Sequence, residues 1–215
     1  MNNRQIVYLT SDYVKTKLQG ETTGHDWWHT VNVQRAAAYI GRKEGANLFI
    51  VELGALLHDI ADWKFHGGDR TANSRAIQEY LTTIGVDETT IARVCEAVKH
   101  VSLKGIANQP DMSLEAKVVQ DADSLEAIGA IAVARTFIWG GYKKKPIYDP
   151  SIPMGRKVEA YAESPTSIHY FYERLVHLKD RLHTATARKI AEKRHRFMQQ
   201  FLQQFFTEWQ GKDLR

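Results

Sequence analysis

The chain has 215 residues, of which 43% are hydrophobic and 10% aromatic, and it carries a formal net charge of +4. This size and composition exclude a disordered chain and predict one domain that spans residues 1–215. The longest apolar runs are far below the roughly 20 residues that a membrane-spanning helix needs, and the N-terminus lacks the pattern of a signal peptide. We therefore expect a cytoplasmic protein without a membrane partner. The single cysteine, Cys95, cannot form an internal disulfide and is expected to be a buried helix residue.

The first half of the chain shows helical periodicity throughout. Residues 28–41 place apolar side chains at helical spacing, and Gly41 offers a stop. Residues 48–59, "LFIVELGALLHD", are apolar almost all round, which predicts a buried helix. Two further helices are expected at 71–84 and 87–101, with Asp87 as the N-cap of the second.

The second half of the chain is also helical, with one irregular interruption. Ser113 is the expected N-cap of one long helix that continues to Gly140 and Gly141, which should end it. The proline-rich stretch 140–157 follows and is expected to be irregular.

The C-terminal part is expected to form two more helices. Ser164 and Pro165 resemble an N-cap and a first-turn proline for a helix through residue 183, and a last helix runs from about Ala185 to Trp209. Phenylalanines of the last helix, among them Phe197, should pack into the core. No alternating pattern supports a sheet, so the predicted fold class is all-α. We expect a single helical bundle with a core at about 25–140 and a C-terminal helical extension at about 159–209.

Four polar residues interrupt this apolar patterning in a way that packing does not explain. His58 and Asp59 directly follow the run "LFIVELGALL", where an unpartnered ionisable pair would be costly to bury. His29 opens an earlier helix, and Asp123 lies within the otherwise apolar stretch around "QDADSLEA". Three helices would then supply imidazole and carboxylate ligands to one divalent ion.

Each of these residues also has a structural interpretation. His29 suits a helix cap, the pair His58 and Asp59 suits an exposed helix end, and acids such as Asp121 and Asp123 suit a solvated helix face. Their combination, in this order along one helical chain, favours a metal site. A shell of nitrogen and oxygen ligands without thiolate suits Mn²⁺, Fe²⁺, Co²⁺, Ni²⁺ or Zn²⁺ and does not choose among them. Mn²⁺ is our first expectation, and Mg²⁺ is a further alternative.

The order His, His-Asp and Asp on an all-helical chain resembles the HD-domain superfamily of metal-dependent phosphohydrolases, in its branch of small stand-alone bacterial proteins. The resemblance rests on "GHDWWHTVNV", "HDIADWKFHGGD", "DADSLEAIGAIAVARTF" and "TSIHYFYERLVHLKDRL". It implies a helical bundle whose metal is held by His29, His58, Asp59 and Asp123, and an enzyme that cleaves phosphate esters or nucleotide phosphoanhydrides. Relatives often carry a basic residue at the position of Ser124, so a phosphate contact would have to come from elsewhere in this chain.

Further side chains are candidates for the chemistry of such a site. Asp62, one helical turn beyond Asp59, is our candidate for orienting or deprotonating the attacking water, although a helix-end carboxylate would also stand there. His25 and Lys64 are candidates for phosphate contacts because each lies close in sequence to a proposed ligand. His66 is a weaker candidate because it precedes two glycines and suits a loop.

More distant basic residues are also candidates for substrate contacts. His100 ends a helix, where capping explains it equally well. Lys143, Lys144 and Lys145 would reach a polyphosphate tail or form a solvated charge run. Arg135 either faces the cleft or pairs with an acid elsewhere.

The sequence therefore predicts a metal-dependent phosphohydrolase acting on a small phosphorylated substrate, with a nucleotide as the first expectation. The bond cleaved would be the one between the α and β phosphates or the one to a terminal phosphate. The alternatives are a non-catalytic module that binds a nucleotide or nucleic acid, and an oxygen-using enzyme with two metals. No phosphate-binding loop, zinc-finger pattern or RNA-binding strand is present, so nucleic acid is not an expected partner. A homodimer is left open.

Overall fold

The structure is a computed structural model that describes residues 1–21, 25–60, 71–99, 101, 111–154 and 163–214. Every regular element within these residues is a helix, which confirms the all-α prediction. No helix among them is long and apolar enough to cross a membrane.

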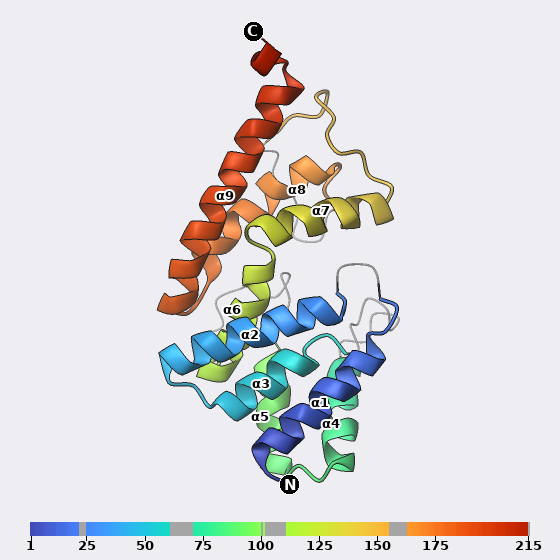
Figure 1. Cartoon of the computed structure of the whole chain (residues 1–215), viewed down its shortest axis with the longest axis vertical. Helices are drawn as coiled ribbons and strands as arrows, with labels where there is room; N and C mark the ends of the chain where they lie inside the picture. The colour runs from blue at the N-terminus through green and yellow to red at the C-terminus, as the bar shows by residue number, and fades with distance from the viewer. Residues whose placement is uncertain (22–24, 61–70, 100, 102–110, 155–162, 215) are drawn as a thin grey trace.

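Helices occupy both halves of the chain (Figure 1). The N-terminal helices are α1 (Asn3–Lys17), α2 (Trp27–Glu44), α3 (Leu48–Leu57), α4 (Ala72–Thr83) and α5 (Glu88–Lys99). The C-terminal helices are α6 (Leu114–Glu126), α7 (Ala130–Tyr142), α8 (Ser167–Glu173), the 3₁₀ helix η2 (Leu175–Arg181), α9 (Ala185–Trp209) and the 3₁₀ helix η3 (Lys212–Leu214).

Helix α3 lies at the centre of the N-terminal group because it packs on two sides. Ile50 and Leu53 belong to a core shared with α1, α4 and α5. Val51 and Ala55 belong to a second core shared with α2, α6 and the C-terminal helices. The run 48–57 is therefore apolar almost all round because nearly every face of this helix is covered, as its sequence predicts.

The prediction of one long helix from residue 114 to the glycines at 140 and 141 is wrong. The chain forms two helices, α6 and α7, with a bend at residues 127–129. Gly129 makes this bend with φ +103°, which L side chains rarely adopt, and a Cβ there would lie 3.0 Å from Arg194 Cβ on α9. The bend directs α7 away from α6 and into the upper group of helices in Figure 1.

Other boundaries also differ from the prediction, since α2 continues past Gly41 to Glu44 and ends at Gly45, which has a left-handed conformation. Helix α7 continues through both glycines to Tyr142, and a Cβ at Gly140 would lie 2.1 Å from Ser167 Oγ, so this glycine serves the close packing of α7 on α8. The N-cap of α8 is Thr166, whose side chain accepts from the His169 amide, and not Ser164. The expected helix 166–183 is in fact α8 followed by η2.

Most helix starts follow the sequence signals. Ser113 accepts from the Ala116 amide at the start of α6, and Asp87 accepts from the Thr90 amide at the start of α5. Helix α9 has the predicted bounds, and Leu202 and its aromatic neighbours pack on the core. Phe197 is an exception among the phenylalanines of this helix, because 45% of it is exposed. Helix α1, which periodicity did not single out, covers α3 through Ile6 and Val14.

Candidate metal centre

Three helices bring the four predicted ligands to one place. His29 lies in the first turn of α2. Asp26 is the N-cap of this helix, and its side chain accepts from the His29 amide at 2.9 Å. His58 and Asp59 directly follow the end of α3, and His58 is its C-cap residue. Asp123 lies in the last turns of α6.

The potential ligand atoms lie within 3.8 Å of His29 Nε2 or His58 Nε2. His29 Nε2 is 3.3 Å from His58 Nε2, 3.7 Å from Asp59 Oδ2 and 3.4 Å from Asp123 Oδ1. His58 Nε2 is 3.3 Å from Asp59 Oδ2 and 3.8 Å from Asp123 Oδ1. Ligand atoms held about 2.1 Å from one ion stand about 3.0 Å apart at right angles and about 3.4 Å apart at tetrahedral angles. These separations fit ligands of one divalent metal ion, and His29, His58 and Asp123 form one group of three that could hold it.

The side chains of this cluster differ in exposure. The two histidine side chains are almost fully buried, at 2% for His29 and 1% for His58, whereas Asp59 and Asp123 are 17% and 19% exposed. The protein therefore encloses the imidazole side of the cluster and leaves its carboxylate side accessible to solvent. A catalytic metal centre needs such access for water and a substrate oxygen.

The His58 ring is oriented for metal binding by a backbone contact. Its Nδ1 lies 2.8 Å from the carbonyl oxygen of Ala55, one turn earlier in α3. Because that carbonyl can only accept, Nδ1 carries the proton and donates it. Nε2, which faces the other ligands, is therefore the atom that can bind a metal.

Without a metal, the cluster carries strongly shifted pKa values. Burial opposes protonation of His58, but the neighbouring Asp59 and Asp123 carboxylates outweigh it and raise its pKa to about 9. Burial also acts to raise the pKa of Asp59, but His58 and His25 hold it well below its usual range. The pKa of Asp123 is lowered in the same way by His29 and His58, against burial. A protonated imidazole thus occupies the position of positive charge that an ion would otherwise supply.

This electrostatic arrangement predicts the pH dependence of metal binding. An ion must displace the proton on His58, whereas the carboxylates are already ionised above about pH 5. Each pH unit below about 9 should therefore weaken the apparent metal affinity by close to tenfold, with release of one proton per ion. Calorimetric titration with Zn²⁺ at about pH 6, 7 and 8, in buffers of different ionisation enthalpy, measures both quantities. A flat affinity profile without proton release would contradict the prediction.

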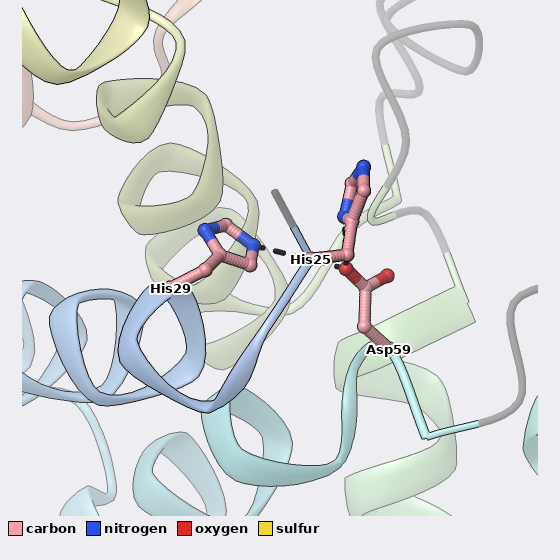
Figure 2. Close-up of side chains that lie close together, drawn as sticks. All are labelled: His25, His29 and Asp59. Carbon is pink, nitrogen blue, oxygen red and sulfur yellow. Dashed lines mark hydrogen bonds and ion pairs between the residues drawn. The ribbon is translucent and has the colours of Figure 1, made fainter. Parts of the chain in front are cut away.

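His25 joins the cluster through Asp59 (Figure 2). Its Nδ1 lies 2.7 Å from Asp59 Oδ2, the same oxygen that faces His29 Nε2, and its side chain is 30% exposed. His25, His29 and Asp59 form a second group of three that could hold a metal ion. His25, predicted as a substrate contact, thus stands beside the centre at its open side.

The two aspartates of "QDAD" have different surroundings. Asp121 is fully buried and accepts from the His183 amide, the Thr184 amide and the Thr184 hydroxyl, at 2.8, 2.7 and 2.7 Å. It thereby holds the N-terminus of α9, for which Thr184 is the N-cap. Asp123, two residues on, faces the histidines instead. The interpretation of Asp121 as part of a solvated face does not hold.

Two further residues, Glu126 and Arg135, lie beside His29. The sequence analysis did not identify Glu126 and left the contact of Arg135 open. Glu126 is 3% exposed, and its Oε2 lies 3.9 Å from His29 Nδ1 and 3.3 Å from Asn32 Nδ2. Arg135 of α7 reaches the same imidazole, with Nη1 2.9 Å from His29 Nδ1. Glu126 lies one helical turn after Asp123, and this spacing on one face of α6 is the signal that would have identified it.

The remaining predicted site residues lie elsewhere or outside the described structure. Asp62, Lys64 and His66 fall within residues 61–70, and His100 is likewise outside the described residues. The run 143–145 follows the end of α7, where Lys143 and Lys145 lie 3.8 and 3.2 Å from Glu163 carboxylate oxygens. Lys145 Nζ also donates to the Ser164 carbonyl at 2.8 Å, and Lys144 is exposed. The structure gives none of these three lysines a described contact with the metal ligands.

The comparison with known proteins agrees with this arrangement. The family model of the HD domain matches residues 27–128, which include all four potential ligands. YpgQ of Bacillus subtilis strain 168 is 40% identical over 204 residues, or 94% of this chain and 92% of YpgQ. The chain belongs to the HD-domain superfamily. The similarity to YpgQ therefore extends beyond the region that the family model matches.

Solved structures show that the whole HD protein has close structural relatives. A protein from Lactobacillus plantarum superposes with a TM-score of 0.82 at 32% identity, covering 98% of this chain and 100% of its own. A HD-superfamily hydrolase from Bacillus thuringiensis does so with a TM-score of 0.77 at 37% identity, covering 97% and 99%. YpgQ, solved in complex with ADP, gives a TM-score of 0.72 at 36% identity, covering 92% and 97%. The chain thus has the fold of an HD-superfamily hydrolase.

Proposed function

We propose that this HD protein is a divalent-metal-dependent phosphohydrolase that acts on a small phosphorylated molecule, most specifically a nucleotide. The observation that carries the proposal is the cluster of His29, His58, Asp59 and Asp123, with its imidazoles enclosed and its carboxylates accessible. A nucleotide is favoured as the substrate because YpgQ binds ADP. Mn²⁺ is the proposed ion, in accordance with the ligand set.

Each residue of the centre would have a separate task. The four ligands would hold the ion, which when bound polarises a phosphoryl oxygen and lowers the pKa of a coordinated water. His25, which donates to Asp59 Oδ2 and is partly exposed, would orient this carboxylate and contact the substrate at the open side. Asp62 is proposed to orient or deprotonate the attacking water, and Lys64 to contact a phosphate oxygen. His100 and the run 143–145 are proposed as outer substrate contacts.

A product assay tests the proposed function. The purified protein is incubated with a panel of nucleoside mono-, di- and triphosphates and Mn²⁺, Mg²⁺, Co²⁺ or Ni²⁺, and phosphate and pyrophosphate are measured separately. We expect turnover that requires the metal and stops with a chelator. Pyrophosphate with monophosphate would identify the bond between the α and β phosphates, whereas phosphate alone would identify a terminal bond. Nucleotide binding without cleavage under any metal would contradict the proposal and favour a regulatory module.

A further inference from the structure

Helix α7 presents an exposed face that is apolar. Its sequence, "AIAVARTFIWGGY", contains one charged residue, Arg135. Three large apolar side chains are nevertheless open to solvent, since Ile131 is 42% exposed, Ile138 51% and Tyr142 59%. A surface helix normally turns charged and polar residues to solvent, and exposed apolar side chains that gather in one place mark binding sites. This face of α7 therefore has the composition of a binding surface.

The three apolar side chains form one line along the helix, and Arg135 stands at its edge. Ile131 and Ile138 are seven residues apart and Tyr142 follows four residues later, a spacing that keeps side chains on one helix face. Arg135 lies four residues after Ile131 and three before Ile138, so it borders the same face. We call Ile131, Ile138 and Tyr142 the α7 stripe. It extends from Arg135 by roughly 6 Å toward the start of α7 and by roughly 10 Å toward its end.

Arg135 connects the α7 stripe to the metal centre. Its Nη1 lies 2.9 Å from Nδ1 of His29, one of the potential ligands. In Figure 1, α7 passes above the N-terminal part of α2, to which His29 belongs. The guanidinium is positively charged and suits the phosphate groups of a ligand, whereas the stripe suits an uncharged part of the same ligand. The two surfaces adjoin, so one molecule can contact both.

Helix α2 adds an exposed aromatic side chain beside the centre. Trp28 directly precedes His29 and is 69% exposed, whereas Trp27 packs on the core. Asn32, one turn after Trp28, donates to Glu126 Oε2 at 3.3 Å, and Glu126 is the last residue of α6. Residues four apart share a helix face, so the face of α2 that carries Trp28 is turned toward the bend from which α7 starts. An exposed indole thus lies next to a metal ligand, on the side where α7 begins.

We propose that Trp28 and the α7 stripe bind the nucleoside part of the substrate, with its base stacked on the indole, while its phosphate groups occupy the metal centre beside Arg135. The inference rests on the proposed phosphohydrolase function and specifies its substrate class, a nucleotide in preference to a phosphate without a base. Nucleobases stack on exposed aromatic side chains, and their faces are apolar. The phosphate chemistry at the edge of the stripe favours this occupant over a second copy of the chain.

The first test compares two ligands that differ only by the nucleoside. Calorimetric titration of the protein with Mn²⁺ present measures its affinity for α,β-methylene adenosine diphosphate and for methylenediphosphonate, neither of which has a hydrolysable phosphoanhydride bond. We expect the nucleotide analogue to bind at least about tenfold more tightly, because stacking of a base on an aromatic side chain contributes about this factor. Equal affinity for the two ligands would overturn the inference.

The second test removes the two surfaces one at a time. Trp28→Ala should weaken binding of the nucleotide analogue by about tenfold, and Ile138→Ser should weaken it by about fivefold. Both variants should bind methylenediphosphonate and Mn²⁺ with the affinity of the unmodified protein, because the phosphate and metal contacts remain. Trp28→Tyr, which keeps an aromatic face, should retain most of the affinity for the nucleotide analogue.

A matched control is Tyr39→Ala, which removes another exposed aromatic side chain of α2, roughly 16 Å along the helix from Trp28, and should change neither affinity. If Trp28→Ala and Ile138→Ser bind the nucleotide analogue normally, or lose affinity for both ligands equally, the assignment is wrong. It is also wrong if Ile138→Ser changes the sedimentation of the protein from dimer to monomer and leaves nucleotide affinity intact. None of these readouts needs turnover, so a failed product assay would reject the proposed hydrolysis without deciding this inference.

Discussion

Replacement of His58 and Asp59 together by alanine should abolish both metal binding and metal-dependent turnover. These residues supply one imidazole and one carboxylate of the four potential ligands, and both lie within 3.8 Å of ligand atoms on α2 or α6. Loss of an outer-shell partner alone costs roughly 10-fold to 100-fold in metal affinity, so loss of two direct ligands should exceed 100-fold. Elemental analysis and calorimetric titration with Mn²⁺ measure the first effect, and the product assay measures the second.

The same chain offers a matched control for this double variant. His177 and Asp180 are an exposed histidine and an exposed aspartate within η2, and neither is one of the potential metal ligands. His177→Ala combined with Asp180→Ala removes the same two residue types and should retain metal binding and turnover. If the His58 and Asp59 variant folds, as circular dichroism would show, and still binds one ion at the original affinity, these residues do not hold the metal.

Asp121→Ala should mainly lower stability, whereas Asp123→Ala should mainly lower metal affinity, although the two residues are almost adjacent. Asp121 accepts three hydrogen bonds in a fully buried site, and its loss leaves the two amides and the hydroxyl at the start of α9 without their acceptor. We expect Asp121→Ala to lower the free energy of unfolding by at least about 3 kcal/mol, because bonds to a charged acceptor contribute about 1.5–3 kcal/mol each. Its metal affinity, measured below the unfolding transition, should be preserved.

Asp123→Ala should instead weaken metal binding by more than about 100-fold and have the smaller effect on the stability of the metal-free protein. Its carboxylate is partly exposed, at 19%, and faces the two histidines. Denaturant unfolding of both variants with and without Zn²⁺ separates the two roles. Equal loss of stability in both metal-free variants, or loss of metal binding in Asp121→Ala, would contradict this division.

Periodicity and capping residues predicted most of the fold because they act locally. Helix α3 is apolar on nearly all faces since both cores use it, and Ser113 and Asp87 cap the helices that they precede. The division of α6 from α7 was not predictable in this way. The apolar pattern continues across the bend, and Gly129 is required there by Arg194, which lies 65 positions further along the chain.

The convergence of His29, His58, Asp59 and Asp123 was predictable because ionisable residues beside apolar runs need partners, and side chains from three separate helices can share one ion. Glu126 and Arg135 depend on tertiary geometry instead. Nothing local to α7 indicates that its arginine reaches the imidazole of His29 on α2, because the bend between α6 and α7 determines where that side chain lies. The different roles of Asp121 and Asp123 likewise follow from the position of α9, which the sequence pattern does not contain.

The account depends most on the claim that four side chains bind one divalent ion. A crystal of the protein grown with Mn²⁺ and measured for anomalous scattering at the manganese edge tests this claim most directly. We predict a single strong peak about 2.1 Å from His29 Nε2, His58 Nε2, Asp59 Oδ2 and Asp123 Oδ1. A well-ordered centre without a peak at saturating Mn²⁺, or a peak coordinated by other residues, would contradict it.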